Sequence, residues 1–303
     1  MLMNLITILG PTATGKTQLA ARLAQKYNGE IISADSRQVY KGMDIGTGKD
    51  LQDYIVDGKK IPYHLIDIAD PKEEFNLYRF LEFFYATFGE ITSRGKIPFL
   101  AGGTALYLDA VLRSYNMKEA LDNEEYLKEL DALTLQELQM RLLTVNPMVH
   151  NTTDLLDKRR LIDALRIAEN KLTVSSAPKA KIDPLVIGVY LERKVVKDRI
   201  TRRLKTRLQE GMIDEVKSLV ESGVSFEKLD FFGLEYRFIG QYLKGSLNYN
   251  DMYQKLNSAI HAFAKRQMTW FRKMEREGVK INWIEGPDFE KACLIIEQHI
   301  YRS

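Results

Sequence analysis

Short apolar runs bounded by glycine and polar residues recur through the first third of the chain. Such runs are typical of strands buried on both faces of a parallel sheet, and they occupy residues 5–9, 30–34, 62–67 and 97–101. Between the runs, the apolar side chains follow three- and four-residue spacing, which predicts helices over residues 18–26, 75–94 and 105–112. This alternation predicts an α/β protein with a parallel sheet.

The alternation stops at about residue 114. Residues 114–184 predict helices only, and we interpret them as an insertion that ends in a polar linker at 177–184. An apolar run at 185–191 predicts the last strand of the sheet, and helices follow it. We therefore divide the chain into the first part of the core, the helical insertion, and the last core strand with the C-terminal helices, at 1–113, 114–184 and 185–303.

The last helix that the spacing of apolar residues predicts is long and covers residues 250–277. Six of its apolar positions follow helical spacing and are expected to pack inward: Met252, Leu256, Ala259, Phe263, Trp270 and Met274. Its second half carries five basic residues, Lys265, Arg266, Arg272, Lys273 and Arg276. This charge favours an RNA-facing surface. His261, in the middle of the helix, is interpreted as structural.

The loop between the first strand and the first helix has the pattern G-x-x-x-x-G-K-T. It reads Gly10-Pro11-Thr12-Ala13-Thr14-Gly15-Lys16-Thr17. Its glycines let backbone amides turn inward at a helix N-terminus and form an anion cradle. Lys16 adds a positive charge, and the Thr17 hydroxyl can bind a Mg²⁺ that bridges two phosphate groups. The motif predicts a P-loop NTPase-like core whose ligand carries a di- or triphosphate.

Polar residues follow two further strands at the same edge of the predicted sheet. Asp35 ends the run at 30–34, and Gly102-Gly103-Thr104 joins the run at 97–101 to a helix. Because ligands of open α/β sheets bind beyond the carboxyl ends of the strands, Asp35 is predicted to be a metal ligand or a base beside the phosphate loop. Thr104 could contact the ligand or cap its helix. A glycine-rich stretch at 42–49 predicts a loop over the site.

Composition and charge change this picture little. Lys and Arg number 44 against 41 Asp and Glu, a net charge of +3 that is too mild to indicate nucleic-acid binding. The single cysteine, Cys293, excludes an internal disulfide and a multi-cysteine zinc site. No run reaches the roughly 18 apolar residues of a membrane span. We therefore expect a cytoplasmic protein with no membrane partner.

Two more predicted helices concentrate positive charge. The helix at 154–166 has an inner apolar face made of Leu155, Leu161, Ile162 and Leu165. Its outward residues are Lys158, Arg159 and Arg166. These side chains could contact a phosphate backbone or only solvent. The helix at 193–208 carries Arg199, Arg202, Arg203 and Arg207. Because it leaves the strand ends near the phosphate loop, it could clamp a leaving diphosphate. For Arg202 and Lys205 we expect solvent exposure.

Six segments, taken in order, resemble the tRNA dimethylallyltransferase (tRNA isopentenyltransferase) family. They are the phosphate loop and residues 34–40, 43–49, 62–67, 101–107 and 264–272, and the similarity extends from residue 4 to about 285. The resemblance implies transfer of a dimethylallyl group from dimethylallyl diphosphate to N6 of the adenosine just 3′ of the anticodon (position 37) of tRNA, with Mg²⁺ as cofactor. The phosphate loop would hold the diphosphate of the donor.

The resemblance also implies roles for individual residues. Asp35 would bind the adenine amine and take its proton, while Lys16, Thr17 with Mg²⁺, and Arg199 would neutralise the diphosphate. The residues assigned to tRNA binding are Asp35, Ser36, Arg37, Gln38, Thr104, Arg159, Arg160, Leu161, Ile162, Asp163, Lys265 and Arg266. The insertion would grip the anticodon stem-loop by phosphate and shape contacts, with the target base flipped into a channel. We expect a monomer.

The chain departs from the family pattern at three places. Residues 232–238 stand, two residues longer, where a Gly-Tyr-Arg/Lys-Glu sequence is common. His261 occupies a position often held by Arg or Lys, and Asp163 one where arginine is usual. These departures leave the predicted chemical centre intact and bear on tRNA contacts.

Three other functions stay open at this point. An adenylate dimethylallyltransferase shares the phosphate loop and Asp35 but prenylates a free nucleotide; the helical insertion and the segment at 264–272 favour tRNA instead. A nucleoside or small-molecule kinase is the default for a phosphate loop alone, and it leaves the insertion unexplained. A non-catalytic RNA-binding protein conflicts with an intact Lys16, Thr17 and Asp35.

Overall fold

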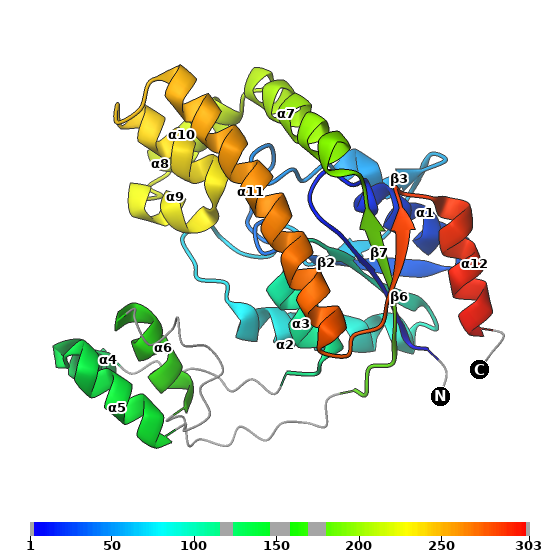
Figure 1. Ribbon diagram of the computed structural model, residues 1–303, viewed down its shortest axis with the longest axis horizontal. Helices are drawn as coiled ribbons and strands as arrows, with labels where there is room; N and C mark the ends of the chain where they lie inside the picture. Colours follow the sequence, from blue (N-terminus) through cyan, green and yellow to red (C-terminus); the bar gives the residue numbers. More distant parts are fainter. Residues whose placement is uncertain (1–2, 116–123, 146–157, 169–179, 301–303) are drawn as a thin grey trace. The chain divides into compact units, whose positions relative to one another are not determined.

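The computed structural model describes residues 3–115, 124–145, 158–168 and 180–300 (Figure 1). The chain forms two compact units, one made of residues 1–114 and 180–303 and the other of residues 115–179. The first unit contains the sheet and the phosphate loop. Among the described residues, no helix is both long enough and apolar enough to cross a membrane.

A six-stranded parallel sheet forms the centre of the first unit. Its order is β5-β2-β6-β1-β7-β8. The bounds are β1 Leu5–Leu9, β2 Gly29–Ala34, β5 Tyr63–His64, β6 Ile97–Gly102, β7 Pro184–Tyr190 and β8 Ile281–Glu285. Every residue of β1 and β2 is buried, as expected for strands covered on both faces. β1 pairs with β6 and β7, so Leu9 lies level with Gly102 and Gly188 at the carboxyl edge. The predicted parallel sheet is confirmed.

Helices cover both faces of this sheet. On one face, Ile6 and Ile8 of β1 share a core with Leu19 and Leu23 of α1 (Lys16–Lys26) and with Ile296 of α12 (Phe289–Ile300). On the other face, α2 (Leu77–Ser93) packs against β2 and β6, and α3 (Ala105–Leu112) follows β6. The remaining elements of the unit are α7 Arg193–Gln209, α8 Met212–Glu221, α9 Phe226–Phe232, α10 Leu234–Leu243, α11 Tyr249–Arg276, the 3₁₀ turn Leu51–Tyr54, and the short pair β3 Ile55–Val56 and β4 Lys59–Lys60.

The prediction that residues 185–191 form the last strand is wrong. β8 follows α11 and pairs in parallel with β7, placing Val186 opposite Ile281 and Tyr190 opposite Glu285. β8 is an edge strand, and of its residues only Ile284 is fully buried, so it lacks the continuous apolar run that marks the inner strands. The predicted strand at 62–67 shrinks for a similar reason to β5, the other edge.

The buried stripe of α11 differs from the predicted one. Its buried residues are Met252, Leu256, Ile260, Ala264, Gln267, Phe271 and Met274. Phe263 is exposed, and Ala259 and Trp270 are only partly buried, so the inward prediction for these three is wrong. Phe263 and Trp270 instead line a cavity described below, and the buried stripe runs one position further along, through Ile260, Ala264 and Phe271.

The second unit is described over three helices, α4 (Glu124–Ala132), α5 (Leu135–Val145) and α6 (Lys158–Ala168). They share a small core made of Leu130, Leu138, Leu142, Leu161, Ile162 and Leu165. The apolar face predicted for Leu161, Ile162 and Leu165 is therefore confirmed. Residues 154–157 of the predicted helix, Leu155 among them, and 177–179 of the predicted linker lie outside the described residues.

Candidate active site at the phosphate loop

The phosphate loop lies between β1 and α1 and needs glycine at two positions. A Cβ on Gly10 would collide with the carbonyl oxygen of Val189 on β7. Gly15 precedes α1 with φ of 85°, in the left-handed region that favours glycine. Within the loop, the Thr14 hydroxyl donates to the Pro11 carbonyl at 3.0 Å. The loop is thus packed against a neighbouring strand and bonded to itself.

Gln267 of α11 ties the phosphate loop to the turn after β6. Its Oε1 accepts from the Thr12 amide at 3.0 Å, and its Nε2 donates to the Gly103 carbonyl at 2.7 Å. The side chain is buried, and a Cβ on Gly103 would lie 2.7 Å from Nε2. The side-chain amide of Gln267 therefore holds both the phosphate loop and the turn after β6. The sequence reasoning gave this residue no role, because neither partner lies near it in the sequence.

Lys16 points into the space above the loop. Its Nζ lies 3.4 Å from the Pro11 carbonyl oxygen. Burial lowers the pKa of Lys16 to about 8, although the Asp35 carboxylate opposes this shift. The ammonium group is therefore still charged at neutral pH but loses its proton more readily than an exposed lysine.

Asp35 directly follows β2, and its carboxylate shapes the next turn. Its Oδ1 accepts from the amides of Arg37 and Gln38, at 2.9 and 3.4 Å. The Thr104 hydroxyl oxygen accepts from the Ser36 amide at 2.9 Å. Thr104 does precede α3, but its side chain makes no capping hydrogen bond to that helix. Of its two predicted roles, capping is therefore wrong, and Thr104 instead joins the turn after β6 to the turn after β2.

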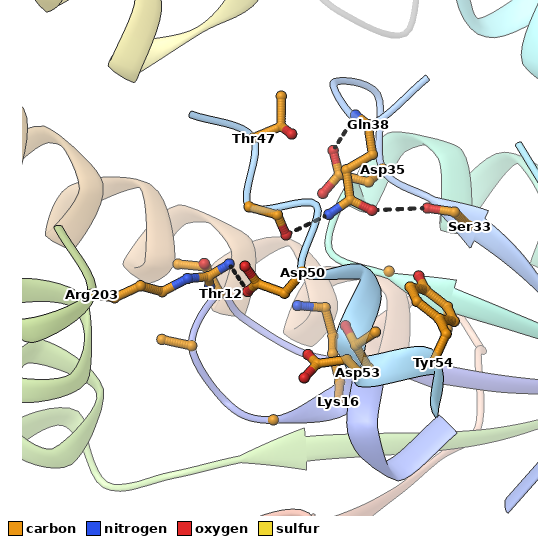
Figure 2. A pocket seen from close by; sticks show the side chains of 16 residues that line it. Thr12, Lys16, Ser33, Asp35, Gln38, Thr47, Asp50, Asp53, Tyr54 and Arg203 are labelled. Atoms are coloured by element: carbon orange, nitrogen blue, oxygen red, sulfur yellow. Dashed lines mark hydrogen bonds and ion pairs between the residues drawn. The ribbon is translucent and has the colours of Figure 1, made fainter. Parts of the chain in front are cut away.

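The glycine-rich stretch at 42–49 lies beside these residues, as predicted. The Gln38 amide group donates to the Gly48 carbonyl at 3.1 Å (Figure 2). A Cβ on Gly48, whose φ is 67°, would collide with the guanidinium groups of Arg203 and Arg207. Lys49 is buried and reaches the carboxylates of Asp44 and Asp67. The stretch is thus a fixed wall of the site.

Two cavities meet at this point. The polar pocket, shown in Figure 2, has a volume of ≈ 110 Å³ and is lined by the phosphate loop, Asp35, Gln38, Gly48, Asp50 and Asp53, with Tyr54 at its side. The aromatic cavity has a volume of ≈ 430 Å³, and its apolar walls include Leu106, Phe232, Leu234, Ile260, Phe263 and Trp270. Five residues line both: Thr12, Lys16, Asp35, Thr47 and Arg203. A molecule could therefore place an anionic end and an apolar end in one continuous site.

Of the four arginines on α7 that were predicted to clamp a diphosphate, Arg203 lines the pocket, whereas Arg199, the one implied by the family resemblance, does not. Arg203 lines both cavities, and its Nη2 lies 3.2 Å from the Asp50 carboxylate. The Arg207 Nη2 lies 3.5 Å from the same carboxylate, and burial, with the nearby Arg203 charge, lowers the pKa of Arg207 to about 10. Arg199 is exposed, donates to the Ala13 carbonyl at 3.4 Å and lines neither cavity. Arg202 and Lys205 are exposed, as expected.

The other residues assigned to RNA fall into two places. In the first unit, the aromatic cavity is lined by Ser36, Arg37 and Arg266. The Arg37 guanidinium lies 5.0 Å from the centre of the Phe231 ring, and Lys265 is exposed. In the second unit, Arg159, Arg160 and Asp163 are exposed on α6, and Asp163 pairs with Arg166. The side chains of Leu161 and Ile162 pack in the core of that unit, which does not favour their predicted contact with RNA.

The structure shows what surrounds two of the places where the chain departs from the family pattern. Gly233 joins α9 to α10 with φ of 114°, and Glu235 and Tyr236 after it line the aromatic cavity. Burial raises the pKa of Glu235. The His261 Nε2 lies 3.2 Å from both the Thr201 hydroxyl and the Lys197 carbonyl on α7. The histidine therefore links two helices, in agreement with its structural interpretation.

The polar pocket offers oxygen ligands but no protein cage for a metal. Thr17, Asp35, Asp50 and Asp53 line it. Across the described residues, no cluster of three or more His, Cys, Asp or Glu side chains is arranged to hold a metal ion. This donor set fits Mg²⁺, which takes one or two protein oxygens and completes its shell with water and phosphate oxygens.

Comparisons with known proteins agree on one family. Residues 38–274 match the family model described as IPP transferase, and residues 3–63 match that of isopentenyl transferase. The tRNA dimethylallyltransferase 1 of Geotalea uraniireducens (strain Rf4) is 54% identical over 283 residues, 93% of each chain.

Solved structures show the same likeness. The tRNA isopentenylpyrophosphate transferase of Bacillus halodurans is 35% identical, with a TM-score of 0.69 over 99% of this chain and 95% of that one. A eukaryotic dimethylallyltransferase described as acting on tRNA is 25% identical, with a TM-score of 0.76 over 98% of this chain and 77% of that one. The predicted P-loop NTPase-like core is therefore confirmed.

Proposed function

Because the chain belongs to the tRNA dimethylallyltransferase family, we propose that it transfers a dimethylallyl group from dimethylallyl diphosphate to N6 of the adenosine just 3′ of the anticodon. The family makes the chain an enzyme that transfers a dimethylallyl group to tRNA. The choice of donor and acceptor atom is supported by the two joined cavities.

One observation carries this proposal: Lys16 and Asp35 line the polar pocket and the aromatic cavity at once. A diphosphate bound on the phosphate loop would place its allylic carbon beside Asp35. The adenine amine then attacks the allylic C1, the C1–O bond breaks, and diphosphate leaves with the bonding electrons. Asp35 takes the proton that the amine loses. Because the donor itself carries the diphosphate leaving group, no ATP is consumed. Catalysis here requires orientation of a weak nucleophile and stabilisation of a leaving anion.

The polar pocket supplies the charges for the leaving group. Lys16 and Arg203 face the pocket, and the Thr17 hydroxyl would hold Mg²⁺ together with diphosphate oxygens. The bound ion would neutralise negative charge on the departing diphosphate. Arg199, the arginine implied by the family resemblance, lies one helical turn from Arg203 and donates to the Ala13 carbonyl of the phosphate loop, so it would act through that loop.

The aromatic cavity supplies the place for an unstacked base. Adenine must leave the anticodon loop before its amine can react, and aromatic side chains such as Phe263 and Trp270 can stack against it. The exposed arginines of α6 and the basic second half of α11 would contact the RNA backbone. We further propose that the enzyme acts as a monomer and, because its substrate is tRNA, that it works in the cytoplasm.

A transfer assay tests the proposal against its nearest rivals. The protein, Mg²⁺ and labelled dimethylallyl diphosphate are offered unmodified tRNA or, separately, AMP and ATP. Label should enter tRNA only, at the adenosine 3′ of the anticodon, and a tRNA carrying guanosine there is the matched control. Label in the free nucleotide would make the chain an adenylate prenyltransferase. Transfer of phosphate from ATP, with no prenyl transfer, would make it a kinase.

A further inference from the structure

The glycine-rich loop is held from outside the sheet by one carboxylate. Glu215 of α8 accepts from three successive loop amides, those of Asp44 at 2.8 Å, Ile45 at 2.6 Å and Gly46 at 3.0 Å. Consecutive amides that converge on an anion form a nest, and hydrogen bonds to a charged acceptor are about twice as strong as neutral ones. A side chain 169 to 171 residues away thus fixes the backbone at the tip of this loop.

Tyr236 of α10 completes the contact. Its hydroxyl donates to Glu215 Oε1 at 2.8 Å, the oxygen that also accepts from Gly46. The Tyr236 ring is buried against the same glycine, because a Cβ on Gly46 would lie 2.7 Å from the ring and its hydroxyl oxygen. Burial raises the pKa of Tyr236 well above its ordinary value, and the Glu215 charge adds to the shift, so the hydroxyl stays a donor.

The two ends of the loop therefore have different anchors. Residues 44–46 are bonded to Glu215, while the Gly48 carbonyl accepts from Gln38 and Asp50 pairs with Arg203. Thr47 lies between these anchors and lines both cavities, and Gly48 and Asp50 line the polar pocket. Movement of residues 44–46 would shift Thr47 in the pocket that it lines with Lys16, because Thr47 alone separates Gly46 from the bonded Gly48.

We propose that Glu215 and Tyr236 form a positioning pair that holds residues 44–48 in the conformation needed to bind the donor diphosphate. Glu215 lines neither cavity and acts through the loop, whereas Tyr236 also lines the aromatic cavity but bonds Glu215 through its hydroxyl. The pair also gives a role to residues 232–238, since Tyr236 belongs to the segment in which this chain departs from the family pattern. The inference rests on the proposed function, because the diphosphate of the donor is what the pocket is taken to bind.

The test compares Glu215→Gln and Tyr236→Phe with matched controls. Glutamine keeps the size of the side chain but turns one acceptor oxygen into an NH₂ group that faces amide donors. Glu221→Gln on α8 and Tyr242→Phe on α10 make the same changes at residues of those two helices that line neither cavity and bond no loop amide. The readouts are the KM for dimethylallyl diphosphate, the KM for tRNA, the kcat, and the Kd for inorganic diphosphate with Mg²⁺ by calorimetry.

We expect Glu215→Gln to raise the donor KM and the diphosphate Kd about tenfold, and Tyr236→Phe to raise both about threefold, since it removes one hydrogen bond. For Glu215→Gln, which alters no cavity wall, the KM for tRNA should stay within about twofold; Tyr236→Phe keeps the ring that lines the aromatic cavity. The double variant should be no worse than Glu215→Gln, because both substitutions break the same contact. Both controls should match the unaltered chain.

Several results would overturn the positioning pair. One is a diphosphate Kd for Glu215→Gln equal to that for Glu221→Gln; another is a donor KM and a tRNA KM that rise together. Should Glu215→Gln fail to fold, Tyr236→Phe decides, and an unchanged Kd in that variant refutes the pair. Absence of prenyl transfer by the unaltered chain would instead refute the proposed function, while the calorimetric Kd still tests the loop.

Discussion

The polar pocket and the aromatic cavity share five wall residues, yet they are built in different ways. The pocket lies among three loop segments, the phosphate loop, the turn after β2 and the stretch at 42–49, and each is hydrogen-bonded to a neighbour in the first unit. The aromatic cavity takes rings from α9, α10 and α11, among them Phe263 and Trp270. Hydrogen-bonded loops keep their positions when a ligand arrives, whereas aromatic side chains can change rotamer. The difference suggests that the donor end is preorganised and that the base end adapts to its RNA.

The largest expected effect comes from the residue where the two cavities meet. Asp35→Ala should lower kcat by about 10²- to 10⁴-fold, the usual range for loss of a general base, while tRNA affinity changes only a few-fold. Asp35→Asn is the informative partner variant, since its oxygen can still accept from the Arg37 and Gln38 amides but cannot take a proton. Near-normal kcat in Asp35→Asn, measured in single-turnover transfer assays, would exclude Asp35 as the base.

The next largest effect should distinguish two arginines of α7, Arg203 and Arg199. Arg203→Ala should lower kcat/KM for dimethylallyl diphosphate by about 10- to 100-fold, because it removes a cation from the pocket wall. Arg199→Ala should cost less than about threefold, since Arg199 lines neither cavity and is exposed. Arg202→Ala, on the same helix, is the control for surface charge. The reverse order of Arg203 and Arg199 would mean that the diphosphate binds beside Arg199 instead of in the polar pocket.

A smaller effect should appear only on the base side. Phe263→Ala should raise the KM for tRNA about tenfold, the order expected for loss of one base-stacking contact. The Kd for inorganic diphosphate should not change. Phe83 is a matched control, because it is about as exposed, 38% against 39%, and lies on α2. Equal losses of tRNA affinity in Phe83→Ala and Phe263→Ala would show that neither ring stacks on the target base.

The smallest expected effect is a pH dependence confined to the pocket. The pKa of Lys16 falls from 10.5 to about 8 on folding, so above pH 8 the unliganded protein loses a charge that the diphosphate needs. Diphosphate affinity should therefore fall a few-fold between pH 7.5 and pH 9, measured by calorimetry in buffers of different ionisation heat. Folding stability has the opposite sign: the unfolded chain binds more protons from pH 8 to 10.5, so the Lys16 contribution to stability rises with pH there.

Local pattern was sufficient for the preorganised half of this site. The phosphate loop depends on glycines and on the strand and helix that flank it, and all of these lie within 26 residues of each other. Asp35 and Thr104 were placed at the correct edge because parallel strands end on one side. Each inference needed only a short segment and a general rule about sheets.

The contacts that the sequence did not reveal all join distant segments. Gln267 binds Thr12 across 255 residues, and Glu215 binds the glycine-rich loop across about 170. On α7, four-residue spacing puts Arg199, Arg203 and Arg207 on one face, but only the packing of the helix decides which turn reaches the pocket. β8 was missed because an edge strand can be partly polar and still complete its ladder.

The same bond from Gln267 to Thr12 has a consequence for synthesis on the ribosome. The phosphate loop emerges early, but the side chain that holds its Thr12 amide is added 255 residues later. β1 likewise waits for β7, some 180 residues further along, before its second edge is paired. Non-local pairing of this kind slows folding and leaves strand edges exposed in the growing chain. The nascent polypeptide therefore passes most of its synthesis with an unfinished diphosphate-binding core, which is completed only when α11 and β8 emerge.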